Sequence, residues 1–444
     1  MVTRRTFVTS AGIAGAAGAL AACSPSKSSS DGSSKSSGSD SKKLTLRIWD
    51  DVAKPAYEES LNAFTEKTGI EAAVEVVPWA DYWKTLPLDI ASGDAADVFW
   101  LNSASFTQYQ QAGNLVDITE TLGEDAAASW EKAVVELYTR DGSLWGVPQL
   151  WDSIALFFNK KLTDEANVDP TKLSFDPAAK SDPLRDAALK LTKDKAGKKP
   201  GESGFDPNAR QQFGFNSAAD RQAIIGPFLA SNGAEWQKDD TYAFDTPEGV
   251  AAFKYMADLV NTWQVAPSAA DTNPNGDFAR DQFIQGKLGL FQSGPYHLMN
   301  ILEGVGDSFE WGIAPMVGGP KGQKSLVHGV VAAGNAKSEN QDGVKKLLEW
   351  LGSAEGQKPI GTKGVGFPGH TDVQSAFVEF WKGKGHDVQQ FIEAAKDPAM
   401  ADTGAKALAG LEAVMPVFQQ IFAGEVPAEE GVPQAVKEGN AAMA

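Results

Sequence analysis

The stretch that decides the fold is residues 146–160, GVPQLWDSIALFFNK. Pro148 fixes its own φ and disfavours a helix, and the apolar run 154–158 has the length of a buried strand. Between them lie Trp151 and Asp152. A carboxylate inside an apolar strand costs free energy unless another group pairs with it. Asp152 is therefore either a partner in a structural salt bridge or cap, or part of a ligand site.

A βαβαβ pattern precedes this stretch. Strands are predicted over 44–49, 70–77 and 97–101, with helices between them and after them. This order predicts a parallel sheet with helices on both faces, and ligands of such sheets bind beyond the carboxyl ends of the strands. The segments that fall there are Trp49-Asp50-Asp51, Pro78-Trp79 and Trp100-Leu101-Asn102-Ser103.

Length and charge restrict the class of protein. A chain of 444 residues is too long for one ordinary core, so two domains are expected. The formal net charge of −18 argues against nucleic acid or anionic lipid as a partner, because both require a basic surface.

The N-terminus predicts export and anchoring. Residues 1–22 carry Arg4-Arg5 before a short Ala/Gly-rich apolar run, as in a twin-arginine signal peptide. Leu20-Ala21-Ala22-Cys23 resembles a bacterial lipobox, in which the cysteine is acylated after cleavage; the alternative is a signal peptide with an incidental cysteine. Residues 23–43 then form a Ser-rich flexible tether, which would leave the protein extracytoplasmic and held by lipid at the outer face of the membrane.

Several segments together resemble the solute-binding proteins of sugar-importing ABC transporters, the family that includes maltose-binding protein. These segments are VPQLWDSIALFFNKKL, FIQGKLGL followed by Gly294-Pro295-Tyr296, and LLEWLGSAEGQ. The resemblance spans about 44–440. It implies an α/β fold with two lobes, of the type II periplasmic-binding-protein kind, joined by hinge strands.

On this resemblance, lobe 1 comprises 44–153 plus 316–367, and lobe 2 comprises 154–315 plus 368–444. Residues 311–315 are interpreted as the return crossing and 327–333 as a strand back in lobe 1. Residues 338–341, SENQ, are interpreted as a capping box before a helix with an apolar stripe.

A sugar needs aromatic rings for its C–H faces and planar hydrogen-bonding groups for its hydroxyls. We expect Trp100, Trp151 and Tyr296 to supply the rings, although core packing is the alternative for each tryptophan. The hydroxyl partners are expected to be Asp51, Asp152 and Ser103, with Lys54 and Arg221 as donors and His297 in possible contact. The matches of Asp51, Lys54, Trp100, Ser103, Asp152 and Tyr296 to cleft positions come from the resemblance, and that of Arg221 is loose.

Other chemistry has weaker support. The G-x-G-x-x-G match at 364–369 contains Pro368 where a dinucleotide site needs a helix. The loop 271–282 begins like a calcium loop but ends in Gln282 instead of glutamate, so a plain turn is the competing interpretation. The four histidines show no metal-ligand spacing and no G-x-S-x-G is present. No metal, cofactor or catalytic residue is therefore expected.

The sequence favours a monomeric receptor that traps an oligosaccharide by hinge closure and delivers it to the membrane-embedded permease subunits of an ABC importer. Two alternatives remain at this point. One is a secreted glycoside hydrolase that uses paired carboxylates such as Asp50 or Asp51 with Asp152. The other is a receptor of the same fold for a solute that is not a sugar.

Overall fold

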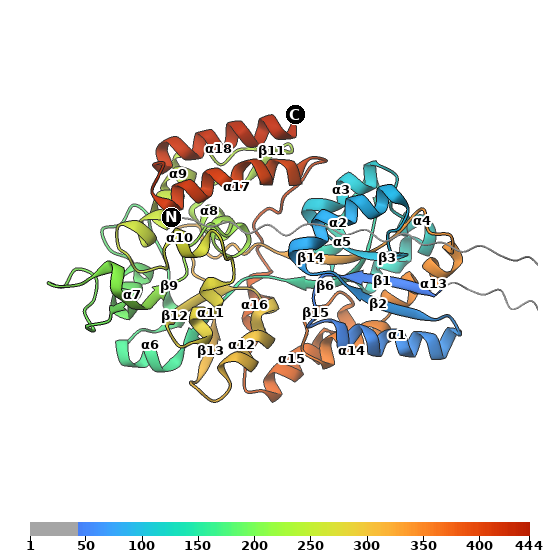
Figure 1. Cartoon of the computed structure of the whole chain (residues 1–444), viewed down its shortest axis with the longest axis horizontal. Coiled ribbons are helices and arrows are strands. Elements are labelled where there is room, and N and C mark those ends of the chain that lie inside the picture. Colours follow the sequence, from blue (N-terminus) through green and yellow to red (C-terminus); the bar gives the residue numbers. More distant parts are fainter. Residues whose placement is uncertain (1–42) are drawn as a thin grey trace, which may run out of the picture. The chain divides into compact units, whose positions relative to one another are not determined.

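The computed structural model describes residues 43–444, and the predicted signal peptide, Cys23 and most of the tether lie outside this part. Its strands form two main sheets (Figure 1). The first has six strands in the order β15-β6-β14-β3-β1-β2, and the second has five in the order β13-β7-β12-β9-β8. Among the residues described, no helix is long and apolar enough to cross a membrane.

The six-stranded sheet begins with the predicted βαβαβ pattern. Its three N-terminal strands are parallel: β1 (Leu44–Ile48), β2 (Ala72–Val76) and β3 (Val98–Asn102). The strand β14 (His328–Gly334) runs antiparallel to both β3 and β6 (Val147–Asp152). The short strand β15 (Phe367–Pro368) closes the sheet at the edge beside β6. The prediction of a parallel sheet is therefore confirmed for β1–β3. In the structure, antiparallel strands extend this sheet.

Local sequence explains the helices of this part. In α1 (Lys54–Thr68), Tyr57, Leu61 and Phe64 are buried on one face, and Gly69 ends the helix with a φ of 72°. The other helices around this sheet are α2 (Trp79–Ser92), α3 (Ser103–Gln111), α4 (Ile118–Leu122), α5 (Lys132–Tyr138), α13 (Gln341–Leu351) and α14 (Ala354–Thr362).

The predicted capping box is wrong in its position. Asn340, not Ser338, is the N-cap of α13, because its side chain accepts a hydrogen bond from the backbone N–H of Gly343. The Ser338 hydroxyl instead donates to Asp97 at 2.6 Å. The predicted apolar stripe is correct, since Val344, Leu347, Leu348 and Leu351 are all buried.

The five-stranded sheet is mixed as well. The strands β9 (Arg210–Phe215) and β12 (Leu288–Ser293) are parallel, and β7 (Ala155–Asn159) runs antiparallel to β12 and to β13 (Trp311–Ala314). The strand β8 (Lys193–Asp194) pairs with β9. The surrounding helices include α6 (Lys160–Ala166), α7 (Pro183–Leu191), α8 (Gly226–Asn232), α9 (Pro247–Asn261), α11 (Phe278–Ile284) and α12 (Leu298–Val305).

The C-terminal helices divide between the two sheets. The helices α17 (Ala407–Ala423) and α18 (Ala428–Met443) pack on each other and on α9. In contrast, α15 (Gln374–Gly383) packs on α14 and β15, and α16 (Gln389–Ala394) contacts β7. The expectation that all of 368–444 wraps the second lobe is therefore wrong for α15, while the other predicted lobe boundaries stay predictions.

The stretch 146–160 passes from one sheet to the other. It forms β6 in the six-stranded sheet and β7 in the five-stranded sheet, with Ser153 and Ile154 between them. The Ser153 hydroxyl donates to the carbonyl of Phe391 at 2.6 Å, and the Ile154 N–H donates to the Ser325 hydroxyl at 2.8 Å. Ser325 belongs to the segment between β13 and β14, so the two crossing segments are hydrogen-bonded to each other.

This connection brings two strand edges together. Both β3 and β6 are antiparallel to β14, so the carboxyl ends of β1, β2, β3 and β6 share one edge with the start of β14. By the same reasoning, the carboxyl ends of β9, β12 and β13 share an edge with the start of β7. Because β6 leads into β7 through two residues, these two edges meet at the crossing. We call them the first and second edges.

Candidate functional site

The site is centred on Asp152, the last residue of β6. Its Oδ1 accepts a hydrogen bond of 2.7 Å from the Gln222 side chain, and its Oδ2 lies 3.9 Å from Nδ1 of His328 at the start of β14. The Asp152 side chain is 16% exposed. Burial raises the pKa of Asp152 to about 8, and the bond from Gln222 opposes this shift. The carboxyl is therefore poorly compensated, as expected of a group that awaits a further donor.

His328 does not provide that compensation. Burial lowers the pKa of His328 to about 4; the Asp402 carboxylate opposes this shift and the Arg221 guanidinium adds to it. The imidazole is thus neutral near pH 7, and its contact with Asp152 is not an ion pair at that pH.

A turn of π-helix carries the groups from the second edge. It spans Arg221–Ile225 after β9, and the Asp220 carboxylate caps it by accepting hydrogen bonds of 2.9 Å from the backbone N–H groups of Gln222 and Ala223. Single π-turns occur frequently at functional sites. Burial raises the pKa of Asp220. The turn holds Gln222 against Asp152, and Asp220 lies at its N-terminus.

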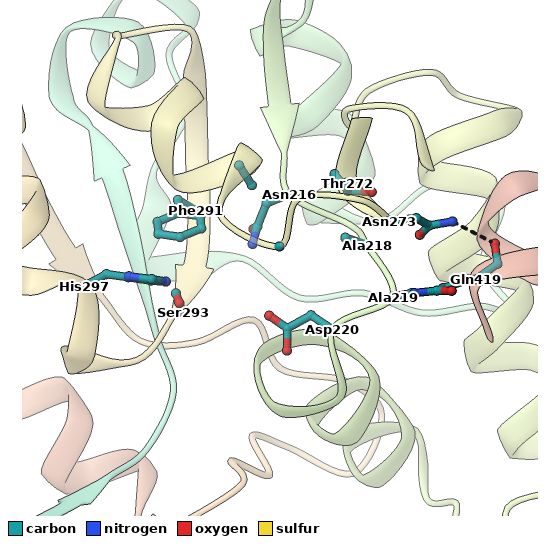
Figure 2. Close-up of a pocket in the computed structure, with 12 residues that line it drawn as sticks. Asn216, Ala218, Ala219, Asp220, Thr272, Asn273, Phe291, Ser293, His297 and Gln419 are labelled. Atoms are coloured by element: carbon teal, nitrogen blue, oxygen red, sulfur yellow. Dashed lines mark hydrogen bonds between the residues drawn. The ribbon is translucent and has the colours of Figure 1, made fainter. Parts of the chain in front are cut away.

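Beside this turn lies a cavity of about 300 Å³ at the ends of β9 and β12. Figure 2 shows the Asp220 carboxylate pointing into it, with Ser293 and His297 on the opposite wall. Asn216 fixes one wall, because its side chain donates to the carbonyl of Gln292 at 2.9 Å and accepts from the N–H of Gln292 at 2.8 Å. Burial lowers the pKa of His297 to about 3, so this histidine is a neutral donor or acceptor. The predicted residue His297 therefore lines a polar cavity.

Tyr296 is the accessible aromatic ring of the second edge. Its side chain is 37% exposed and its ring packs edge-on against His297, with centroids 4.8 Å apart. Gly294 makes this position possible, since a Cβ there would lie 2.1 Å from the tyrosine ring. Desolvation and the carboxylates of Asp220 and Asp152 raise the pKa of the phenol. Tyr296 thus lies within electrostatic range of both acids.

The structure does not support two of the predicted stacking rings. Trp100 is 1% exposed, and its ring is covered by Trp49 and Tyr57 at centroid distances of 4.9 and 5.4 Å. Trp151 is 4% exposed and stacks on Phe367 of β15 at 4.6 Å. Both tryptophans are core residues in this structure, because neighbouring elements fill the space that a sugar would need.

Arg221 is held by contacts within the protein, while its Nε and Nη1 have no hydrogen-bond partner, so its role as a donor to a ligand stays a prediction. Its guanidinium lies 3.8 Å above the Trp236 ring and 3.5 Å from Oδ2 of Asp402, and only 8% of its side chain is exposed. Asp402 in turn accepts a hydrogen bond of 2.8 Å from the Trp236 indole. Arg221 therefore fastens the segment before α17 to the second edge, and its neighbour Gln222 reaches Asp152.

The remaining predicted residues follow strands of the first edge. Asp51 is exposed just after β1, and Lys54 begins α1 with its ammonium 3.6 Å from Glu58. Ser103 is buried at the start of α3, directly after β3. These three residues lie at the same sheet edge as Asp152, but they follow other strands than β6.

Sequence reasoning missed Asn216, Asp220 and Gln222. A usable signal was present: the residues 213–222, FGFNSAADRQ, read as a strand followed by a polar turn and an Asp N-cap. The rule that ligands lie beyond the carboxyl ends of parallel strands selects this turn, but it does not say which of its side chains reaches Asp152.

The contacts of residues 271–282 bear on the two interpretations of this loop, a calcium loop or a plain turn. Asp271 accepts a hydrogen bond of 2.6 Å from Ser268, and Asp277 forms a 3.0 Å ion pair with Arg280. Within 43–444, no group of three or more His, Cys, Asp or Glu residues is arranged to hold a metal ion. The carboxylates of this loop have protein partners, as in a structural turn.

Comparison with known proteins places the chain in a family. The crystal structure of UspC from M. tuberculosis is 38% identical, with a TM-score of 0.74 over 90% of this chain and 100% of that one. The Listeria monocytogenes ABC substrate-binding protein Lmo0181 in complex with cycloalternan shares the fold at 19% identity, with a TM-score of 0.78 over 91% of this chain and 99% of that one. A maltooligosaccharide ABC transporter solute-binding lipoprotein of Streptococcus pneumoniae is 22% identical over 76% of this chain and 74% of its own length. The model of the family described as bacterial extracellular solute-binding protein matches residues 50–358, and the chain therefore belongs to that family.

Proposed function

We propose that the protein is the extracytoplasmic sugar receptor of an ABC importer, which binds an oligosaccharide between the first and second edges and releases it unaltered to the permease. The observation that carries this proposal is the bond from Gln222 to Asp152, which puts a poorly compensated carboxyl of the first edge among the polar groups of the second. Sugar hydroxyls are suitable donors for such a carboxyl.

The relatives support the same class of ligand. The similar proteins include a maltooligosaccharide-binding lipoprotein and a structure with bound cycloalternan, and both ligands are oligosaccharides. The accessible Tyr296 ring and the polar cavity beside Asp220 suit a ligand with apolar faces and many hydroxyls. All of this favours a sugar over other solutes.

Hinge closure is the proposed mechanism. The crossing segments at Ser153 and Ser325 are hydrogen-bonded to each other, and Ser153 also bonds to Phe391 in the segment that passes between the sheets after α15. Rotation about these segments would change the separation of the edges. A ligand that contacts both edges only when they are close shifts the population toward the closed form. The permease would then recognise that form.

Lipid anchoring through Cys23 completes the proposal. Export by the N-terminal segment and acylation of Cys23 would hold the receptor at the outer face of the membrane. Expression of the full chain with Cys23→Ser tests this step: we expect the variant in the medium and the wild type in the membrane fraction. Equal membrane retention of both would contradict the anchor.

The binding function is tested with a thermal-shift panel followed by product analysis. The panel contains malto-, isomalto-, cello- and xylo-oligosaccharides of two to five rings, with amino acids and polyols as non-sugar solutes. We expect a rise in melting temperature with at least one oligosaccharide series, and the same sugar recovered intact by chromatography. A shortened sugar would instead support the hydrolase, and stabilisation by the non-sugar solutes alone would contradict a sugar receptor.

A further inference from the structure

Three tryptophans form an aromatic cluster that the proposed site does not yet use. The ring of Trp49 lies 5.3 Å from that of Trp79 and 5.5 Å from that of Trp83, and the rings of Trp79 and Trp83 are 5.2 Å apart. Trp79 is 52% exposed, while Trp49 and Trp83 are half-buried. We call these three residues the tryptophan shelf.

The shelf lies on the first edge. Trp49 directly follows β1 and precedes Asp50 and Asp51. Trp79 begins α2, and only Val77 and Pro78 separate it from the end of β2. The carboxyl ends of β1 and β2 share this edge with that of β6, which ends in Asp152. The shelf therefore lies at the same end of the sheet as the candidate site, with β3 and β14 between β1 and β6.

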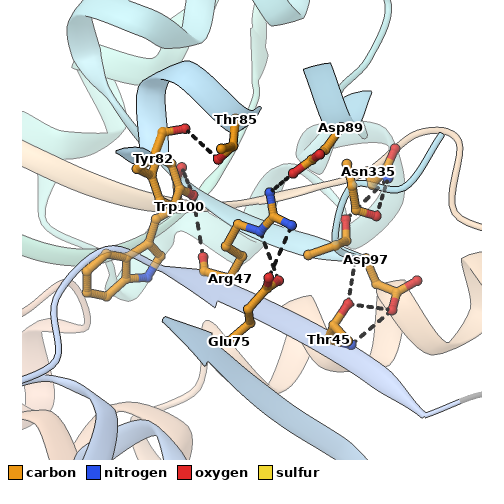
Figure 3. A network of polar contacts seen from close by, with 11 residues as sticks. Thr45, Arg47, Glu75, Tyr82, Thr85, Asp89, Asp97, Trp100 and Asn335 are labelled. Carbon is orange, nitrogen blue, oxygen red and sulfur yellow. Dashed lines mark hydrogen bonds and ion pairs between the residues drawn. The ribbon is translucent and has the colours of Figure 1, made fainter. Parts of the chain in front are cut away.

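The shelf is also held rigidly. Arg47 in β1 donates hydrogen bonds to Glu75 in β2 at 2.9 Å and to Asp89 in α2 at 2.5 Å (Figure 3). Tyr82, on the first turns of α2, donates to the carbonyl of Trp100 in β3 at 2.8 Å. These bonds fix α2, and hence Trp79, relative to the strands. A rigid aromatic ring loses little conformational entropy when a ligand stacks on it.

Core packing explains Trp100 but not Trp79. A large ring that is half in water contributes less to folding than a buried one, and here it is supported from behind by two other indoles. Trp79 and the exposed Asp51 follow the neighbouring strands β2 and β1. An exposed indole and a carboxylate on one edge suit a sugar ring, which offers C–H groups to the indole and hydroxyls to the carboxylate. The sequence placed Trp49 and Trp79 at the edge where ligands bind, but gave neither of them, nor Trp83, a role in binding.

We propose that the tryptophan shelf is a subsite for an outer ring of the oligosaccharide, so that the protein prefers longer chains over disaccharides. This inference rests on the proposed sugar-binding function. Stacking is expected to strengthen binding of a ligand that reaches Trp79 by about 2- to 12-fold, which corresponds to the usual range for aromatic pairs.

The test compares Trp79→Ala with wild type by calorimetric titration of one linkage series from two to five rings. The series is the one among the malto-, isomalto-, cello- and xylo-oligosaccharides that stabilises the wild type. We expect the variant to lose affinity for the longest chain within the stated range and to bind the disaccharide within twofold of wild type. Trp79→Phe should recover most of the loss, because it keeps a ring. Leu88→Ala, on the same helix at a residue 68% exposed, is the matched control and should change nothing.

The outcomes separate the two proposals. If the wild type binds no sugar of the panel, the proposed function fails and the shelf fails with it. If the wild type binds but Trp79→Ala weakens all chain lengths equally or none, only the shelf is refuted. Unchanged affinities together with impaired uptake by cells would show that Trp79 contacts the permease instead, which also overturns the inference.

Discussion

The Gln222 amide donates a 2.7 Å hydrogen bond to the Asp152 carboxylate, although the two residues are 70 positions apart. One ends a strand of the six-stranded sheet and the other lies in a π-turn that follows a strand of the five-stranded sheet. This single bond therefore connects the groups on either side of the crossing.

Replacement of Asp152 by alanine should weaken oligosaccharide binding by about 10- to 100-fold, the usual effect of losing a hydrogen bond to a charged group. This magnitude applies because hydroxyl groups that donate to the carboxylate favour its ionised form in the complex. Asp152→Asn keeps the shape and one acceptor and should lose less. Calorimetric titration measures both, with Asp125→Ala as a control because Asp125 lies in a 3-10 helix that starts from Gly123, away from the two edges. Wild-type affinity in a folded Asp152→Ala protein would remove Asp152 from the site.

The stability of the unliganded protein should depend on pH through Asp152. Its folded pKa is about 8, whereas the unfolded value is about 3.9. Between these values the folded chain keeps a proton that the unfolded chain has released, so the free energy of unfolding falls as pH rises and the contribution is lost above pH 8. His328 and His297, with lowered pKa values, have the opposite slope, but only below about pH 6.5.

Between pH 6.5 and 8 the two histidines no longer contribute, and comparison with Asp152→Asn separates this carboxyl from Asp220, whose pKa is also raised by burial. There, denaturant unfolding should show a decrease of up to about 1 kcal/mol per pH unit for wild type relative to Asp152→Asn. Gln222→Ala removes the bond that opposes the shift, so its decrease should continue to higher pH than that of wild type. Parallel curves for wild type and Asp152→Asn would show that this carboxyl titrates normally.

Much of the fold could be predicted because local patterns agree with the global topology. The apolar face of α1, the Gly69 cap and the strand-to-strand passage through 146–160 are each encoded within a few neighbouring residues. The order βαβαβ then restricts the sheet to few arrangements. The antiparallel insertion of β14 could be placed in the sheet but its pairing partners could not, since these depend on a segment almost 200 residues away from β6.

The candidate site was less predictable for a physical reason. Whether an aromatic ring is a platform or part of the core depends on what covers it, and the residues that cover Trp100 and Trp151 come from elsewhere in the chain. The surroundings of Arg221 were hidden in the same way, because Asp402 lies 181 positions away and pairs with it only in the folded protein. The chemical types of the site residues were visible in the sequence, but their exposure was not.

The buried Arg47 should be important for the stability of the six-stranded sheet. Arg47→Met leaves the carboxylates of Glu75 and Asp89 without their cation, and both are partly shielded, with side chains 44% and 29% exposed. Because of this partial exposure, we expect a loss of about 1–3 kcal/mol in denaturant unfolding. Lys132→Met removes the cation of a pair that is 87% and 66% exposed, and should cost less than about 0.5 kcal/mol. Equal effects of the two substitutions would contradict the structural role of Arg47.

The Arg221–Asp402 contact can be tested through Gly226, which begins α8. A Cβ at this position would lie 2.2 Å from Nη1 of Arg221, which is held between Trp236 and Asp402 and has little room to move. Gly226→Ala should therefore displace the guanidinium and destabilise the protein by about 1–3 kcal/mol, as overpacking usually does.

Gly383→Ala serves as the control for this substitution, since no atom lies within 4 Å of a Cβ built there. It should leave the denaturation midpoint nearly unchanged. Because Arg221 fastens the segment that carries Asp402, the Gly226→Ala protein should also show faster proteolysis near residues 397–404 than the control. If Gly226→Ala lowers stability without any change in proteolysis there, Arg221 supports the π-turn alone and does not fasten that segment.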